Sequence, residues 1–298
     1  LLAIVWGSGI GGFGSPLGGS ANLVAISYLE NICGHEFMYI DWVSRFLPFL
    51  MLTMLLNLVI LLSIKLPVTK LANTKSYFND MYKQLGPMSK GEKIGLGLFI
   101  ISTVLAFARP LFADILPALR PAYIFFICGL LTFMFRDDEG KVLLTWKQAE
   151  KELMWGMFFL FAGGLALGKL VTGTGAATKL AEVITVMPLT GGIETIFAFT
   201  AFSTILTEVS SNTAAASIAI PIIQSIAEAL GLNVIPYILV TIVAVNCAYI
   251  LPVSTRAIPI GYGLEPSELF KHGVMLSILN VFLTTVVGYI FINYRPRF

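Results

Sequence analysis

A polar segment whose residues could hold small ions lies between two strongly apolar runs. The run before it is IETIFAFTAFSTIL, the run after it is IAIPIIQSIAEAL, and the segment itself is TEVSSNTAAAS, from Thr207 to Ser217. Hydroxyl and amide side chains both donate and accept hydrogen bonds, and oxygen ligands suit a hard cation such as sodium. The segment therefore has the chemistry of an ion-binding site.

The two apolar runs are too short to cross a bilayer separately. The arm before Thr207 has about 15 residues and the arm after Thr213 about 17, and at ~1.5 Å per residue neither spans ~30 Å of hydrocarbon comfortably. Together they predict a re-entrant hairpin with TEVSSNT at its tip. The first helix would end there with free carbonyls. The second would begin there with free N–H groups, which Ser211, Asn212 and Thr213 suit as capping residues.

A tip of this kind can hold a cation on its carbonyl side and an anion on its N–H side. The alternative is that Ser-Asn-Thr is only a helix cap. Glu208 is the one acid in the tip, and an ionised carboxylate at the bilayer centre costs ~2.5–3.5 kcal/mol on insertion scales, so it should face protein or water. It could accept hydrogen bonds from backbone N–H groups, carry a proton or bind a cation, and we favour the first role.

The composition is that of a membrane protein. Of 298 residues, 57% are hydrophobic and only 12% are charged, and the mean hydropathy is +0.85. A soluble domain carries roughly 25% charged residues, so we expect an all-α polytopic membrane protein whose surroundings are a lipid bilayer. The net charge of +2 is too small, and the basic residues too scattered, to indicate a nucleic-acid partner.

Candidate spans lie near 42–64, 92–108, 121–135, 153–170 and 270–293, and interrupted apolar segments cover 1–30, 186–230 and 236–264. The stretch 65–93 has six lysines and two acids, whereas 30–41 has three acids and no Lys or Arg. The positive-inside rule therefore puts 65–93 in the cytoplasm and 30–41 outside. The loop 136–152 is expected to form either a helix along the membrane surface or an ordinary soluble loop.

Gly, Pro, Ser, Thr or Asn break the apolar pattern in three places, namely Gly7–Asn22, Thr207–Ala214 and Leu251–Gly263. Backbone left unpaired in hydrocarbon costs several kcal/mol per group, so an unwound stretch must line a cavity or be buried in protein. Recurring interruptions of this kind indicate the binding site of a transporter.

Two other classes of membrane protein fit the sequence less well. An intramembrane enzyme is not expected, because the candidate spans contain no Ser/His pair, no HExxH motif and no paired aspartates. A channel would need a continuous polar stripe, and the polar residues form isolated interruptions instead.

The segment Thr207–Thr213 resembles the hairpin pattern T-E-x-x-S-N-T of the divalent anion–sodium symporters (DASS), a family of the ion-transporter superfamily. The stretch LLTWKQAEKELMWGMFFLFAGGLALGKLVTGTG is similar to the sequence that precedes this hairpin in the family. GSPLGGSAN resembles the family's first broken helix, G-T-x-I-G-T-P-P-N, and LPVSTRAI resembles the second, L-P-V-A-T-P-P-N. The departures from these two patterns are Gly19, Ser20 and Ala21 in the first and Arg256, Ala257 and Ile258 in the second.

The resemblance implies an inverted-repeat fold in which each repeat has one Ser-Asn-Thr hairpin and one broken helix. Only one such hairpin motif is present, so the chain is expected to be the C-terminal part, with the first hairpin upstream of Leu1. Residues 1–35 would end the first transport region, 36–135 would form scaffold spans and a Lys-rich loop, 136–264 would form the second transport region, and 265–298 would be the last scaffold span.

The resemblance also implies a set of site residues. Those expected to bind substrate are Ser20, Asn22, Ser211, Asn212, Thr213, Thr255 and Arg256. Those expected to bind sodium, mostly through backbone carbonyls, are Gly14, Ser15, Thr207, Ser210, Asn212 and Ser254. Arg256 could clamp a substrate carboxylate, replace a coupling cation, or serve structurally by pairing with Glu208 or by reaching the cytoplasmic surface.

The function that the resemblance implies is secondary active transport of small divalent anions, namely di- or tricarboxylates. Coupling to sodium, assembly as a homodimer and an elevator movement are further implications, as is a place in a cell membrane, the bacterial inner membrane. The alternatives are an anion exchanger without sodium coupling, and an arsenite or sodium–proton carrier of the same superfamily.

Overall fold

The computed structural model describes residues 1–64, 74–153 and 189–294, together with single positions between 155 and 174. The described residues form helices and connecting loops, and one bridge pair, Arg136 with Val142, is the only strand-like pairing among them. The predicted all-α class is therefore confirmed. The candidate span 153–170 lies largely outside the described residues.

The chain divides into two units. One contains residues 1–37, 41–64 and 155–298, and the other contains residues 38–40 and 65–154. All of the predicted substrate and sodium ligands belong to the first unit, so the candidate site lies within a single compact body.

The helices of the second unit are α4 (Thr74–Leu85), α5 (Lys90–Phe107), η2 (Arg109–Leu111), α6 (Pro121–Thr132) and α7 (Trp146–Glu152). α5 and α6 pack against each other. Ser89 and Glu92 form a capping box that starts α5, and Thr145 and Gln148 form another that starts α7. Of the two alternatives for 136–152, a helix is present only from Trp146 to Glu152, and its place along the membrane surface remains a prediction.

The helices of the first unit are α1 (Leu2–Gly12), η1 (Pro16–Gly18), α2 (Ser20–Cys33), α3 (Tyr39–Ser63), α10 (Ile193–Val209), α11 (Asn212–Ala229), α12 (Val234–Asn246), η3 (Ser254–Ala257), α13 (Ile258–Gly261) and α14 (Pro266–Tyr294). Within the described part of the chain, two helices are long and apolar enough to cross a membrane alone, α3 and α14. Three interruptions separate α1 from α2, α10 from α11 and α12 from α13, where the polar stretches predicted them.

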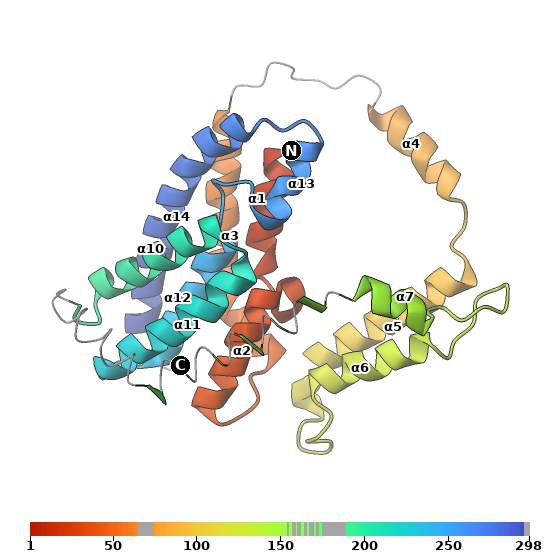
Figure 1. Ribbon diagram of the computed structural model, residues 1–298, viewed down its shortest axis with the longest axis horizontal. Coiled ribbons are helices and arrows are strands. Elements are labelled where there is room, and N and C mark those ends of the chain that lie inside the picture. Colours follow the sequence, from red (N-terminus) through yellow and green to blue (C-terminus); the bar gives the residue numbers. More distant parts are fainter. Residues whose placement is uncertain are drawn as a thin grey trace. The chain divides into compact units, whose positions relative to one another are not determined.

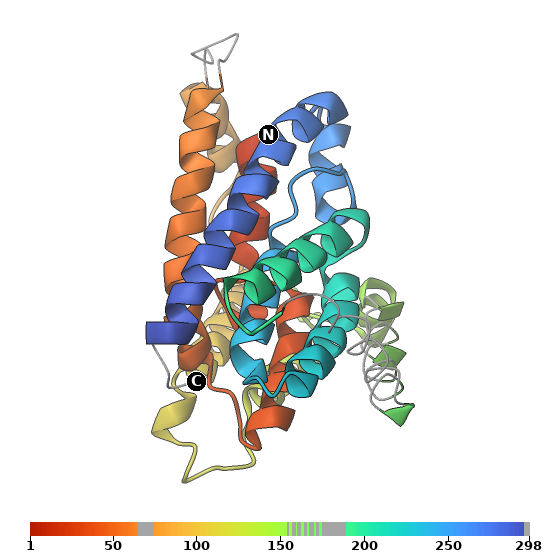
Figure 2. The ribbon, with the colours of Figure 1, turned by 90° about the vertical axis from the view of Figure 1, so that its left-hand side faces the viewer.

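α12 forms the centre of the first unit. Apart from Ile235, all of its 13 residues are buried, as expected for a helix that is apolar on every side. It packs against α2, α10, α11 and α14, which surround it in the two views of the ribbon (Figures 1 and 2). The polar interruptions at its two neighbours, α2 and α11, are thereby brought to the end of α12.

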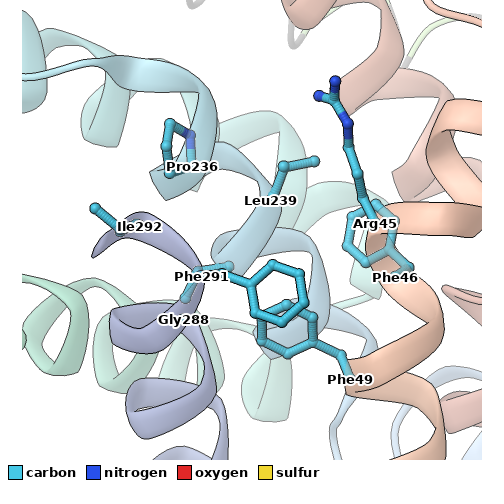
Figure 3. A pocket seen from close by; sticks show the side chains of 9 residues that line it. Arg45, Phe46, Phe49, Pro236, Leu239, Gly288, Phe291 and Ile292 are labelled. Carbon is cyan, nitrogen blue, oxygen red and sulfur yellow. The ribbon is translucent and has the colours of Figure 1, made fainter. Parts of the chain in front are cut away.

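An apolar contact joins α12 to the two long helices. The rings of Phe49 in α3 and Phe291 in α14 are 5.4 Å apart, and Leu239 and Pro236 of α12 lie beside them (Figure 3). The space between these side chains is only about 10 Å³, roughly the room of one water molecule, so the contact is packed core and not a ligand site.

The unwound segment after α12 is held tightly between two helices. The Trp6 Nε1 of α1 donates to the Tyr249 carbonyl oxygen at 3.3 Å, and Gly273 of α14 presses against the same carbonyl. A Cβ atom on Gly273 would overlap the Tyr249 oxygen and carbon, so α14 approaches this closely because residue 273 has no side chain.

Replacing Gly273 with Ala should therefore push α14 away from the unwound segment. We expect the free energy of unfolding to fall by about 1–3 kcal/mol, as for other overpacked cores. Thermal unfolding of the purified protein in detergent measures the loss. Gly129→Ala in α6 is the matched control, because a Cβ there meets nothing within 4 Å. Equal stability of the two variants would contradict the close contact.

Candidate functional site

A polar cavity of about 170 Å³ lies where the helix interruptions of the first unit meet. Its walls come from α1, the α1–α2 interruption, the α10–α11 tip and the last residue of α12. The lining residues are Ser8, Gly9, Gly12, Gly18, Gly19, Ser20, Ala21, Ser211, Asn212, Thr213 and Asn246. None of these lining residues is charged, so any ionic ligand would be held by helix ends, hydroxyls, amides and backbone groups.

Two helix N-termini face this cavity. α2 begins at Ser20 and α11 begins at Asn212, and the Ser211 Oγ accepts from the Ala214 N–H at 3.2 Å as the α11 cap. The Ser20 and Thr213 hydroxyls hydrogen-bond each other across 193 residues of sequence. Each N-terminus carries a partial positive charge and spare N–H groups, so the cavity is suited to an anion.

Asn212 is oriented by α10. The Thr207 hydroxyl lies 3.0 Å from the Asn212 Oδ1 and 2.7 Å from the Val245 carbonyl oxygen. The contact with Thr207 holds one end of the Asn212 amide, and Asn212 also lines the cavity. Of the predicted substrate ligands, Ser20, Ser211, Asn212 and Thr213 are thus brought together around one space.

Asn22, also predicted to bind substrate, is fully buried behind the cavity wall. Its Nδ2 lies 2.7 Å from the Gly12 carbonyl oxygen and 2.8 Å from that of Ser15, and its Oδ1 accepts from the Asn246 Nδ2 at 3.1 Å. These bonds take up both ends of the amide, so Asn22 holds the α1–α2 interruption in place. Contact between Asn22 and a substrate remains a prediction.

Asn246 was missed by the sequence analysis. It lines the cavity, and a Cβ on Gly12 would lie 3.3 Å from its Oδ1. Its Nδ2 is held by the Ile242 carbonyl oxygen as well as by Asn22. The available signal was a lone amide that ends the apolar run of α12, immediately before the predicted interruption.

Glu208 accepts hydrogen bonds from three consecutive backbone N–H groups of the unwound segment. Its Oε1 accepts from Tyr249 at 2.7 Å, and its Oε2 accepts from Ile250 and Leu251, both at 3.1 Å. The residue is only 6% exposed. Buried N–H groups need acceptors, and a carboxylate is a strong one, so the preferred role for this acid is confirmed.

Arg256 lies against the end of α10 and is not among the residues that line the cavity. Its Nη1 is 3.6 Å from the Glu208 Oε2, and its Nη2 donates to the carbonyl oxygens of Thr207 at 3.2 Å and Glu208 at 3.4 Å. Its Nε donates to the Val253 carbonyl at 3.2 Å. This geometry shows that Arg256 pairs with Glu208 and covers two carbonyls at the end of α10. Contact between Arg256 and a substrate remains a prediction.

The remaining predicted sodium ligands lie on the interruptions themselves. Gly14 and Ser15 lie between α1 and η1, and the Ser15 carbonyl accepts from Asn22. The Ser210 hydroxyl donates back to the Leu206 carbonyl at 2.7 Å, at the end of α10. Ser254 and Thr255 lie in η3. Their part in binding an ion or a substrate remains a prediction.

The chain is similar to known membrane transporters. It is 31% identical over 98% of its length to an uncharacterized transporter of Haemophilus influenzae, covering 62% of that protein. It is 25% identical to the sodium-dependent dicarboxylate transporter SdcS of Staphylococcus saprophyticus and 26% identical to that of Staphylococcus aureus, over 97% of this chain and 58% of each relative. The chain thus spans about three fifths of the length of these relatives.

The family match covers almost the whole chain. The sequence matches the family described as the sodium:sulfate symporter transmembrane region over residues 2–294. The match confirms the resemblance seen in the hairpin motif, and the apolar helices agree with a multi-pass protein of the cell membrane. The chain therefore belongs to the sodium:sulfate symporter family of membrane transporters.

Proposed function

We propose that this chain supplies a substrate-binding region of a secondary active transporter for small divalent anions. The observation that carries this proposal is the meeting of two helix N-termini, those of α2 and α11, at one hydroxyl-lined cavity. Two positive helix ends suit a ligand that carries two negative charges. Weak, neutral hydrogen bonds also suit a transporter, because the substrate has to leave as well as bind.

The size of the cavity favours a small solute. Pockets for drug-sized ligands are ~300–1,000 Å³, and this cavity is about 170 Å³. A dicarboxylate is the preferred substrate, because two relatives are named as sodium-dependent dicarboxylate transporters. A tricarboxylate is a larger anion with the same carboxylate groups. Sulfate is the competing candidate substrate, because the family description names it.

Sodium would be transported as a second substrate. The relatives' names support sodium coupling, and the neutral oxygens around the cavity are ligands of the kind that a hard cation prefers. The predicted carbonyl ligands fit less well, since the Ser15 carbonyl accepts from Asn22 and that of Thr207 accepts from Arg256. An anion exchanger without sodium coupling is therefore the second candidate function. The contacts of the described residues do not favour an arsenite or sodium–proton carrier.

The helix order supports an internal repeat as part of the same proposal. α1, η1 and α2 precede the long helix α3, and α12, η3 and α13 precede the long helix α14. The pair α10–α11 would be the re-entrant hairpin of the second repeat. Elevator movement of the interrupted helices against a scaffold, and a homodimer, complete the proposal, and the division of the chain into transport and scaffold regions remains a prediction.

Uptake by the complete protein in proteoliposomes tests the function. We expect an imposed inward sodium gradient to drive saturable accumulation of a labelled dicarboxylate. Unlabelled dicarboxylate should compete with this uptake more strongly than sulfate does. Stronger competition by sulfate would indicate that sulfate, and not a dicarboxylate, is the substrate. Large currents that do not saturate would indicate a channel and would contradict the proposal.

Replacing Asn212 with Ala should abolish uptake and leave folded protein in the membrane. The substitution removes an amide that lines the cavity and that Thr207 contacts. Initial uptake rates measure the effect, and size-exclusion chromatography shows whether the protein is folded. Asn293→Ala is the matched control, because Asn293 is exposed near the end of α14. Uptake by Asn212→Ala at the control rate would show that Asn212 binds no substrate.

Replacing Thr213 with Val keeps the side-chain shape and removes the hydroxyl that bonds to Ser20 at the cavity wall. We expect the affinity for substrate to fall about tenfold, the effect of losing roughly 1.4 kcal/mol of hydrogen bonding. The half-saturating substrate concentration for uptake measures this change. Thr241→Val is the control, because the Thr241 hydroxyl bonds inside α12 to the Tyr237 carbonyl. An unchanged affinity for Thr213→Val would place the substrate elsewhere.

A further inference from the structure

The end of α10 is a buried concentration of negative charge. The Thr207 and Glu208 carbonyls lie in the last turn of the helix, where the helix dipole is negative, and the Glu208 carboxylate adds a full charge beside them. Both residues are buried, at 0% and 6% exposure. Oxygens gathered in this way, away from water, form a cradle that attracts a cation.

The guanidinium of Arg256 fills this cradle. It contacts both carbonyl oxygens and lies 3.6 Å from the carboxylate, and the Arg256 residue is only 5% exposed. An Arg side chain keeps its proton at any physiological pH, so the positive charge is permanent. A second cation bound to the same oxygens would be repelled by it at short range.

Thr207 connects the contacts of Arg256 to the cavity. The Thr207 carbonyl accepts from Arg256, while the Thr207 hydroxyl contacts the Asn212 Oδ1 at 3.0 Å. Asn212 lines the cavity and starts α11. Arg256 thus contacts the end of α10 that orients Asn212.

We propose that Arg256 is a tethered cation, which fills the position at the end of α10 where a mobile sodium ion would otherwise bind. This end of the site then takes no sodium during transport, and the α10–α11 tip is ordered in its absence. Any sodium that is coupled to transport binds on the side of the α1–α2 interruption. The inference rests on the proposed transport function and determines how many sodium ions accompany each anion.

An ordinary structural ion pair would have the same contacts but different consequences. Its loss would destabilise the protein in a way that no small cation repairs. The loss of a tethered cation leaves a cradle that a free cation can enter, because the Glu208 carboxylate and the two carbonyls remain.

Thermal unfolding of the complete purified protein with Arg256→Gln separates these cases. Midpoints are compared in sodium, guanidinium and choline chloride at equal, low ionic strength. For the wild type, we expect the unfolding midpoint in sodium to differ from that in choline only by the effect of any other sodium site. For Arg256→Gln we expect the midpoint in choline to fall, and sodium or guanidinium to raise it by several degrees more than in the wild type. The readout is binding, so it remains valid even if no anion uptake is found and the proposed function fails.

The control is the double variant with Glu208→Gln and Arg256→Gln, which removes both charges. We expect it to lose the additional response to sodium and guanidinium. If Arg256→Gln does not accumulate as folded protein in choline, its recovery during purification in guanidinium or sodium becomes the measurement. A midpoint or recovery for Arg256→Gln that responds to the cations no more than the wild type would overturn the proposal, as would an equal response in the double variant.

Discussion

Backbone groups in an interrupted helix have to find partners inside the protein, because hydrocarbon offers none. Glu208 meets this requirement for the interruption after α12, where its carboxylate accepts from three consecutive N–H groups. Asn22 meets it for the interruption after α1 by donating to two carbonyls. One charged and one neutral side chain therefore satisfy the backbone of two breaks, and the break after α1 lines the cavity.

The helix ends gain their chemistry from this arrangement. With the unwound segments paired to protein groups, the N-termini of α2 and α11 remain directed at the cavity, where they can attract an anion without a charged side chain. The hydrogen bond between Asn22 and Asn246 also joins the two interruptions to each other.

The contribution of the ion pair between Glu208 and Arg256 depends on its location at the end of α10. A buried ion pair is weak support for stability in itself, because the desolvation of two charges opposes their attraction. Here the carboxylate is needed by the unwound backbone, and the guanidinium also covers carbonyls at the end of α10. The pair therefore lies at the helix end where Thr207 contacts Asn212, and so it belongs to the site as well as to the fold.

The amino-acid sequence by itself determined the helical class, the three interruptions and the polar tip with Asn212, because hydropathy and breaks in an apolar pattern are local properties. It also led to the role of Glu208, since a lone acid at that depth needs donors. Only the tertiary structure decided that Asn246 meets Asn22, 224 residues away, and that Arg256 pairs with Glu208. Several partners were chemically equal for each of these side chains, and only the packing of α2, α10 and α12 brings one of them within hydrogen-bonding distance.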